Sequence, residues 1–342
     1  MSRLYSQSES LRVGVIGLGL IGGSIAKRLG VKEVTGVLDN NPVTCESAEV
    51  EGFRVYSSVS ELAENVDLIF VATPMPEMKS VFDQIGDADD SGRLVVSDVG
   101  SVKSPTRSLV RSRRRTWAYV GGHPMAGTEF SGFAAASTDL LRGARWVLCL
   151  EEETDLSAFL SVADVISRAI GARVIPLQAK HHDSAVARIS HLPYVVSAAL
   201  SQIVESSSSP ELLYQLAAGS FRDGTRVAGT PPMLSKEMCY QNREALTSVL
   251  RKYVELLEHV SDDLDSDSDK ALLEFFQTGF AGRMSYLDSS AEANLHSVDL
   301  SEDEYTVRSS IIEAGQRGGM ITRLVMTKNE EYLEFSLPRR QT

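Results

Sequence analysis

A histidine and a serine lie in two short segments whose composition suits proton transfer. His123 is preceded by Gly121-Gly122 and followed by Pro124, and Ser101 lies in the segment 98–103. A neutral imidazole can accept a proton near neutral pH, so His123 is a candidate general base. The Ser101 hydroxyl could orient that base or a substrate. Each residue also has a plain structural explanation, because loop histidines are commonly unreactive and a serine here can cap a helix.

Two arginines further along the chain could bind a substrate carboxylate. Arg222 and Arg226 lie four residues apart in Gly219-Ser-Phe-Arg-Asp-Gly-Thr-Arg226, so on a helix they can face the same way. Each guanidinium can hold a carboxylate through paired hydrogen bonds. The same spacing equally suits ion pairs on the protein surface.

A polar stripe precedes the two arginines. One face of a predicted helix carries Asp183, Ala187, Ser190 and Tyr194. His191 borders this face, and Pro193 removes a backbone hydrogen bond and predicts a kink there. The pattern indicates either a lined pocket or a polar groove between packed helices.

Residues 13–39 have the pattern of a dinucleotide-binding segment. A strand-like run leads into Gly17-Leu-Gly-Leu-Ile-Gly-Gly-Ser24, a helix-like stretch follows, and the next strand ends at Asp39. Gly17 permits a tight turn, Gly19 lets the backbone approach a pyrophosphate, and Gly22 allows close packing of helix on strand. A carboxylate at Asp39 binds the adenosine ribose and repels a 2′-phosphate, so NAD is the expected cofactor and NADP the alternative.

The elements that position these residues alternate between strand and helix up to about residue 177. Continuous apolar runs predict buried strands at 68–72, 94–98, 118–121, 146–150 and 173–176. Such strands, separated by helices, indicate a parallel sheet covered on both faces. Its ligands bind at the carboxyl ends of the strands, where Thr73, Ser101 and His123 are expected in loops.

Beyond residue 177 the pattern becomes helical, with helical periodicity at 179–206, 211–218, 233–260 and 270–287. We therefore predict an α/β fold with a Rossmann-type doubly wound parallel sheet in residues 1–177. An all-helical domain for substrate binding and dimerisation is expected in residues 178–303. Residues 304–342 contain a helix-like stretch and two strand-like runs, and they form a short C-terminal extension without an assigned function.

Composition narrows the classes of partner. The chain has 342 residues and a net charge of −12, which argues against nucleic acid or an anionic membrane as a partner. The three cysteines fit neither a disulfide framework nor a metal-ligand spacing, so we expect no metal site and a reducing compartment. No apolar run is long enough to span a bilayer, and residues 1–11 lack the apolar core of a signal peptide. These features predict a cytoplasmic enzyme.

Together, these parts describe a hydride-transfer enzyme for a small anion that bears a hydroxyl. Five motifs, in this order and spacing, resemble the prephenate and arogenate dehydrogenases of tyrosine biosynthesis. They are Gly-Leu-Gly-Leu-Ile-Gly-Gly-Ser (17–24), Asp-Val-Gly-Ser-Val-Lys (98–103), Gly-His-Pro-Met-Ala-Gly-Thr-Glu (122–129), Ser-His-Leu-Pro (190–193) and Phe-Arg-Asp-Gly-Thr-Arg (221–226). The resemblance covers about residues 12–290. It implies oxidative decarboxylation of a cyclohexadienol, with a hydride passing to the nicotinamide and loss of CO2 leaving a phenol.

The resemblance also implies roles for individual residues. His123 would accept the proton of the ring hydroxyl, Ser101 would orient both groups, and Arg226 would clamp a carboxylate. Other positions around the same pocket would be Asp183, Ser190, His191, Tyr194, Arg222, Thr128 and Glu129. The cofactor would contact Gly17, Gly19, Leu20, Ile21, Gly22, Asp39, Thr73 and Ser101. Members of the family dimerise through the helical domain, so a homodimer is expected.

One position departs from the family pattern. Members that use prephenate often carry a second histidine after the proline, where this chain has Tyr194. Arogenate is therefore the expected substrate and prephenate the alternative. The rival enzymes are a β-hydroxyacid dehydrogenase and an imine reductase, which place a lysine near the hydride. A regulatory protein that binds NAD without turnover is the non-enzymatic rival.

Overall fold

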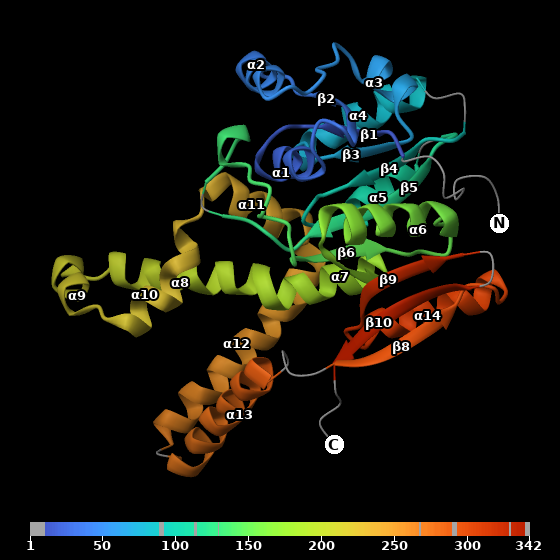
Figure 1. Cartoon of the computed structure of the whole chain (residues 1–342). Coiled ribbons are helices and arrows are strands. Elements are labelled where there is room, and N and C mark those ends of the chain that lie inside the picture. The colour runs from blue at the N-terminus through green and yellow to red at the C-terminus, as the bar shows by residue number, and fades with distance from the viewer. Residues whose placement is uncertain are drawn as a thin grey trace. The chain divides into compact units, whose positions relative to one another are not determined.

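Two compact units make up the chain in a computed structural model (Figure 1). The structure describes residues 11–88, 92–112, 115–128, 130–266, 268–288, 293–327 and 330–338. Of these, residues 11–180 and 293–338 form the first unit, and residues 181–288 form the second unit. None of the helices in these ranges is long and apolar enough to cross a membrane.

The first unit is built on one sheet. Its strands are β1 (Val13–Ile16), β2 (Val34–Leu38), β3 (Leu68–Val71), β4 (Val95–Asp98), β5 (Ala118–Pro124), β6 (Arg145–Cys149), β7 (Arg173–Leu177), β8 (Ala293–Asp299), β9 (Met320–Met326) and β10 (Glu331–Pro338). Across the sheet their order is β2-β1-β3-β4-β5-β6-β7-β9-β10-β8. The strands from β2 to β5 pair in parallel, which confirms the predicted doubly wound sheet.

Helices cover both faces of this sheet. They are α1 (Leu20–Leu29), α2 (Pro42–Val50), α3 (Val59–Asn65), α4 (Met75–Ala88), α5 (Ser104–Arg111), α6 (Leu156–Asp164) with its π-helical continuation η2 (Val165–Ile170), α14 (Glu304–Gln316) and the short 3₁₀ turn η1 (Phe133–Ala135). Neighbouring residues of β3 point to opposite faces. Phe70 joins one apolar cluster, with Ile25 of α1, while Ile69 joins the other, with Phe82 of α4. This alternation places the core in two layers, one on each face of the sheet.

Strand β5 changes its pairing partner in the middle. Ala118–Gly121 pair in parallel with β4, whereas Gly122, His123 and Pro124 pair antiparallel with β6. The prediction that His123 lies in a loop was therefore wrong, because its backbone pairs with Val147 of β6. A Cβ on Gly122 would lie 2.7 Å from the carbonyl oxygen of Asp98, so the glycine allows β5 to pass close to the end of β4 while it changes partner.

The C-terminal residues extend the same sheet. Within the first unit, β9 pairs with β7 through Val174 and Ile321, and β10 and β8 follow in antiparallel order. The helix-like stretch and two strand-like runs expected after residue 304 correspond to α14, β9 and β10. Strand β8 lies in the range 178–303, where only helices were expected. Its sequence signal is weak because its two large apolar residues, Leu295 and Val298, are three positions apart and point to opposite faces, the first exposed and the second buried.

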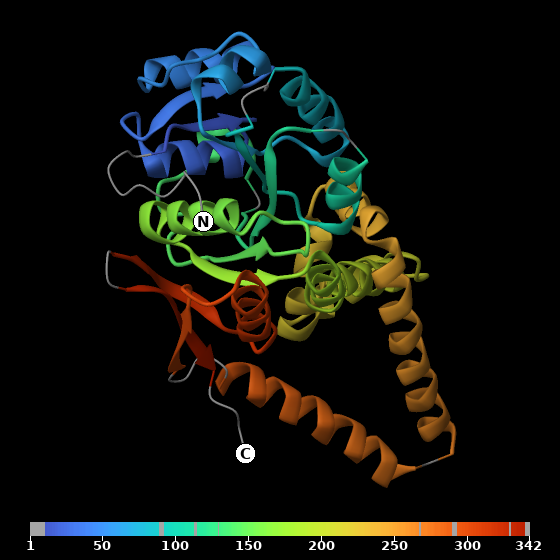
Figure 2. The ribbon, with the colours of Figure 1, turned by 90° about the vertical axis from the view of Figure 1, so that its right-hand side faces the viewer.

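The second unit is helical throughout its described residues. It contains most of α7 (Ala179–Val186), the π-helical turn η3 (Ala187–His191), α8 (Leu192–Glu205), α9 (Pro210–Leu216), α10 (Gly219–Thr225), the 3₁₀ turn η4 (Arg226–Gly229), α11 (Pro232–Gln241), α12 (Arg243–Asp265) and α13 (Asp269–Asp288). The π-helical turn ends at His191, two residues before Pro193, where the sequence predicted a kink. Figure 2 shows α12 and α13 as two long helices that are consecutive in the chain and joined at one end.

Candidate active site

The glycine-rich turn between β1 and α1 is tightly packed at two of its glycines. Gly17 has a φ of +88°, and a Cβ there would lie 2.8 Å from the backbone carbonyl of Ala72. A Cβ on Gly22 would lie only 1.9 Å from the Gly17 oxygen. These two positions require glycine because the turn is left-handed at the first and the helix meets the strand at the second.

Gly19, which lies between these two packed glycines in the sequence, has open space around it instead. A Cβ added to Gly19 would meet no described atom within 4 Å. No side chain of the described residues caps the N-terminus of α1, whose first amides are therefore available to an anion. Beside this turn, just past β3, the buried Thr73 hydroxyl has no hydrogen-bond partner among the described residues. These groups fit a pyrophosphate and the polar atoms attached to it.

The carboxylate of Asp39 is fixed beside the same turn. It accepts hydrogen bonds from the backbone N–H groups of Leu18, at 2.6 Å, and Asn41, at 2.8 Å. Asp39 directly follows β2, which is the neighbour of β1 in the sheet. An acid held at the end of the second strand is where an adenosine ribose is bound in dinucleotide folds, so the residues present fit NAD.

Ser101 and His123 lie at the same edge of the sheet. Ser101 follows β4, and His123 lies in β5, which pairs with β4. Both residues are half-buried, so each keeps part of its surface accessible. The first unit thus gathers the glycine turn, Asp39, Thr73, Ser101 and His123 at the carboxyl ends of neighbouring parallel strands, as the sequence predicted.

The buried carboxylate of Asp98 was not recognised from the sequence. It is fully buried, and one of its oxygens accepts a hydrogen bond of 2.9 Å from the N–H of Gly100. The other oxygen accepts the hydroxyl of Tyr119 at 2.6 Å and the N–H of Gly122 at 3.4 Å. Asp98 therefore binds the segment before Ser101 and the segment before His123 at once.

Lys103 supplies the positive charge for Asp98. Its ammonium donates to the Asp98 carboxylate and, at 2.5 Å, to the carbonyl oxygen of Gly122. Lys103 is 1% exposed, so it is committed to these partners and does not face solvent. Asp98 and Lys103 are five residues apart in one motif, which is the signal that could have suggested the pair.

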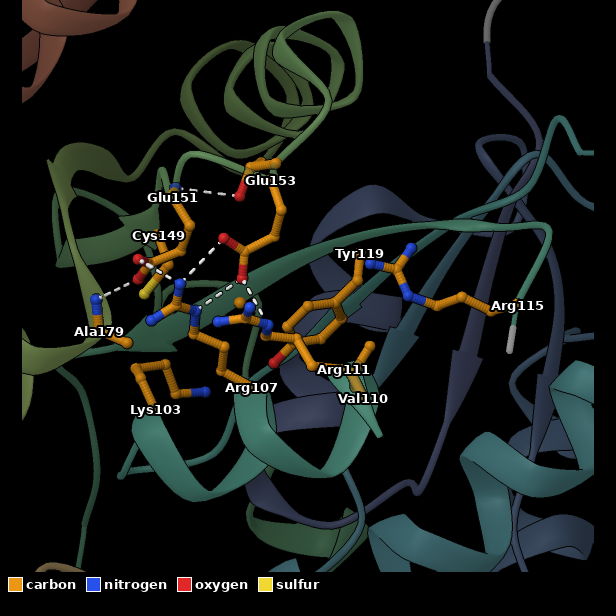
Figure 3. A pocket seen from close by; sticks show the side chains of 12 residues that line it. Lys103, Arg107, Val110, Arg111, Arg115, Tyr119, Cys149, Glu151, Glu153 and Ala179 are labelled. Atoms are coloured by element: carbon orange, nitrogen blue, oxygen red, sulfur yellow. Dashed lines mark hydrogen bonds and ion pairs between the residues drawn. The ribbon is translucent and has the colours of Figure 1, made fainter. Parts of the chain in front are cut away.

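A small pocket next to Lys103 and Tyr119 is lined by charged side chains (Figure 3). Arg107 donates to Glu153 at 2.8 Å and lies 3.2 Å from Glu151. Glu151 in turn accepts the N–H of Ala179, the first residue of α7, at 2.6 Å. Because Glu153 lies against both Arg107 and Arg111, the charges that line this pocket are largely paired with one another.

The loop after His123 is anchored to the nucleotide-binding helix. The hydroxyl of Ser24 accepts the N–H of Ser137 at 3.0 Å, and a Cβ on Gly23 would lie 2.8 Å from that of Ala136. Thr128 of this loop is exposed, and its hydroxyl accepts the N–H of Phe130. Glu129 lies outside the described residues. The final Gly-Ser of the glycine motif thus has a packing role that sequence reasoning did not assign.

In the second unit, two predicted residues are joined through a third that was missed. The side-chain amide of Asn242 donates to the backbone oxygen of Asp183, at 2.8 Å, and to Nδ1 of His191, at 3.1 Å. His182 and Asp183 form a buried pair at 2.8 Å. Burial lowers the pKa of His191, and so does the nearby His182, which keeps the His191 imidazole neutral and able to accept from Asn242.

The predicted polar stripe is changed by the π-helical turn. A π turn contains more residues than an α turn, so the buried set becomes Asp183, Ala187 and His191, while Ser190 and Tyr194 are half-buried. The helix type also changes between the two arginines, because α10 ends at Thr225 and Arg226 begins η4.

The arginine segment packs against the helix that carries Tyr194. The hydroxyl of Ser197 in α8 donates to the carbonyl oxygen of Gly224 at 2.6 Å. Arg222 is 81% exposed and lies 3.8 Å from Asp223, and Arg226 is also exposed. Within the second unit, both guanidinium groups are therefore accessible to an anion.

A parallel sheet with this glycine turn, the acid after β2 and polar groups at the strand ends defines a nucleotide-dependent dehydrogenase. Two family models match the chain: the nucleotide-binding domain of prephenate dehydrogenase over residues 21–176, and the dimerization domain of the same enzyme over residues 178–278. The chain therefore belongs to the prephenate dehydrogenase family, which also includes arogenate and cyclohexadienyl dehydrogenases, and it is an NAD-dependent oxidoreductase.

Named relatives span the substrates of this family. The cyclohexadienyl dehydrogenase of Zymomonas mobilis is 30% identical over 281 residues, covering 80% of this chain and 94% of its own. The Synechocystis arogenate dehydrogenase structure is 30% identical, with a TM-score of 0.71 over 81% of this chain and 100% of its own. A Corynebacterium glutamicum structure, solved as a candidate prephenate dehydrogenase, is 30% identical with a TM-score of 0.82 over 90% of this chain and 98% of its own.

Proposed function

We propose that the chain converts arogenate to tyrosine by oxidative decarboxylation, with NAD as hydride acceptor. Tyr194, which stands where prephenate-using members often carry a histidine, is the observation that carries the choice of arogenate. Arogenate and prephenate differ only in the side chain, which bears an ammonium in the first and a keto group in the second. A phenol cannot take up the positive charge of an imidazolium, so Tyr194 imposes no like-charge repulsion on the ammonium.

The proposed proton chemistry centres on His123. Its imidazole takes the proton of the ring hydroxyl as the ring carbon loses a hydride, and Ser101 holds the hydroxyl and the imidazole in line. The ring carboxylate then leaves as CO2, and its bonding electrons make the ring aromatic with a negative oxygen. His123 returns the proton to that oxygen, so arogenate and NAD give tyrosine, CO2 and NADH in balance.

The proposed binding groups hold the substrate and do not themselves react. Arg226 pairs with a substrate carboxylate, and Arg222, Ser190, His191, Tyr194, Asp183, Thr128 and Glu129 contribute to the same recognition. Because aromatisation drives the reaction, the chain needs to hold the ring in place, accept one proton and neutralise the carboxylates.

The proposed cofactor contacts follow the glycine turn. The pyrophosphate binds at the turn formed by Gly17, Gly19, Leu20, Ile21 and Gly22. Asp39 binds the ribose hydroxyls, and Thr73 and Ser101 contact the part of the cofactor beyond the pyrophosphate. When bound, NAD supplies the acceptor for the hydride. NAD is preferred to NADP because the fixed Asp39 carboxylate repels a 2′-phosphate, and its neighbours Asn40 and Asn41 offer no cation to hold one.

The first test is turnover with four mixtures, arogenate or prephenate, each with NAD or NADP. We expect NADH formation with arogenate and NAD. A preference for prephenate would keep the family and overturn the substrate proposal, and equal rates with NADP would overturn the role of Asp39. His123→Asn should bind NAD normally but lose kcat by about 100-fold or more. Unchanged turnover in that variant would exclude His123 as the base.

We further propose that the chain forms a homodimer through the second unit. No residue of α13 is buried in the described chain, although Leu273, Phe276, Phe280, Met284 and Leu287 lie along one face of it. A stripe of large apolar side chains over four helical turns exposes far more apolar surface than a single exposed apolar residue does. Such a stripe is typical of a face that a partner covers. A second copy of the chain supplies a matching stripe, and the family model for this region describes a dimerization domain.

The oligomeric state tests this proposal directly. Phe280→Glu, which places a charge in the middle of the stripe, should turn a dimer into a monomer in light scattering coupled to size-exclusion chromatography. Glu274→Gln changes an exposed position of the same helix and should leave the dimer intact. A monomeric parent protein, or a dimeric Phe280→Glu variant, would contradict the proposed interface.

A further inference from the structure

One buried carboxylate connects the two segments that carry the proposed catalytic residues. Asp98 accepts the N–H of Gly100, the residue before Ser101, and the N–H of Gly122, the residue before His123. The segments belong to neighbouring strands, β4 and β5, and their sequence separation is large. A shift of Asp98 would therefore move the backbone next to both side chains.

The Lys103 ammonium completes this connection from the other side. It bonds the Asp98 carboxylate and the carbonyl oxygen of Gly122, so both polar groups of the Gly122 backbone are held by one ion pair. Gly122 is the residue at which β5 leaves β4 and begins to pair with β6. The ion pair thus lies at the point where the direction of the His123 backbone is set.

Tyr119 fixes the orientation of the carboxylate. Its hydroxyl donates to Asp98 at 2.6 Å, and its ring packs edge-on against Phe82 at 6.0 Å between centroids. Burial is the main reason that the pKa of Tyr119 is raised well above its ordinary value, and the negative charge of Asp98 is the second. The phenol therefore remains protonated and acts as a donor. Figure 3 shows Tyr119 and Lys103 among the side chains that line one small pocket.

We propose that Asp98, Lys103 and Tyr119 form a positioning network that aligns Ser101 with His123. The inference rests on the proposed role of His123 as the base. Asp98 and Lys103 are buried and bonded to each other, and the three residues act through the backbone of Gly100 and Gly122. They therefore control the geometry of the proton transfer.

A purely stabilising role explains the network less well. Buried ion pairs add little net stability, because desolvation of the two charges offsets their attraction, and apolar replacements of similar size are often tolerated. What an ion pair with several hydrogen bonds supplies is a defined geometry. The bonds of this network go to the two backbone segments that carry Ser101 and His123, which is where a defined geometry affects turnover.

The experiment uses the full-length enzyme and two variants of the network. The double variant Asp98→Asn with Lys103→Met removes both charges together, so that no unpaired charge stays buried and folding is preserved. Tyr119→Phe removes one hydroxyl and keeps the ring against Phe82. Lys79→Met is the matched control, since Lys79 also pairs with an aspartate, Asp83 at 2.9 Å, but is 67% exposed.

Turnover and binding should separate in the network variants. We expect kcat to fall by about 10- to 100-fold in the double variant and by less in Tyr119→Phe, since a displacement of about 1 Å has effects of this size. The dissociation constant for NAD and the KM for substrate should stay within about twofold. Lys79→Met should match the parent enzyme. An unchanged kcat in the double variant would overturn the proposal, as would equal losses in kcat, KM and NAD binding.

A direct view of His123 keeps this inference separate from the proposed function. The chain has six histidines, and the NMR signal of the His123 ring is the one missing in His123→Asn. In both network variants that signal should move, while those of the exposed His259 and His296 should not. An unmoved His123 signal would refute the network. Full activity of His123→Asn would refute the base and leave the positioning result standing.

Discussion

Two glycines of the nucleotide-binding turn should respond to alanine in different ways. In Gly22→Ala the new Cβ would lie 1.9 Å from the Gly17 oxygen and 2.8 Å from the Ala72 Cβ, so α1 must move away from β1 and β3. Overpacking of this kind costs about 3 kcal/mol, and the better helix propensity of alanine returns about 1 kcal/mol. For a unit of this size, the remaining 2 kcal/mol or so lowers Tm by roughly 4–8 °C.

Gly19→Ala should affect binding more than stability. Its Cβ would meet no described atom, and its φ of −68° suits alanine, so we expect a stability loss below about 1 kcal/mol. The same Cβ would occupy the space through which the pyrophosphate approaches the backbone. A rise of about tenfold or more in the dissociation constant for NAD, equivalent to about 1.4 kcal/mol, should follow.

Circular dichroism melting without cofactor and calorimetric titration with NAD measure the two effects. Gly22→Ala should lose both Tm and affinity, because the displaced helix no longer presents its amides to the anion. Gly19→Ala should lose affinity with only a small change in Tm. An unaltered Tm in Gly22→Ala would refute the packing argument, and normal NAD binding by Gly19→Ala would refute the position assigned to the pyrophosphate.

Three further predictions concern the second unit. Arg226→Ala should raise the KM for arogenate much more than it lowers kcat, and steady-state kinetics that show an unchanged KM would remove Arg226 from the carboxylate site. Tyr194→His should raise the ratio of kcat/KM for prephenate to that for arogenate, and an unaltered ratio would show that this position does not select the side chain. Because the folded-state pKa of His191 is lowered, its contribution to stability is full above the unfolded value of 6.5 and is lost as the pH falls below it. Urea unfolding at fixed protein concentration should show that stability falls over this pH range. The fall should be smaller in His191→Gln, and an equal pH dependence in that variant would exclude His191 as its cause.

The nucleotide-binding turn could be predicted from sequence because its signal is local. The roles of Gly17 and Gly22 depend on residues within one strand-turn-helix segment, so the spacing of the glycines already contains the geometry. The strands of the parallel sheet were predictable for a similar reason, since each is a continuous apolar run. For the turn and for these strands, the structure agrees with what the sequence predicts.

The features that sequence analysis missed depend on partners far along the chain. Asp98 is part of a recognisable motif, but its bonds to Tyr119 and Gly122 form only when β5 lies beside β4. His123 looked like a loop residue because glycine and proline flank it, whereas its backbone is held by a strand that follows later. Asn242 was missed because 59 and 51 residues separate it from Asp183 and His191, the two residues that its side-chain amide joins.

The order of strands in the sheet has a consequence for how the chain is made. Strand β7 receives its second neighbour, β9, from residues that leave the ribosome long after β7 itself. Until then, β7 is the edge of a sheet with seven of its ten strands, and it displays unpaired backbone groups that can pair with other nascent chains. Shortening the chain after residue 292 would make that transient edge permanent. We therefore expect a shortened product to accumulate as aggregates during synthesis, even though every residue of the glycine turn, Ser101 and His123 is present in it.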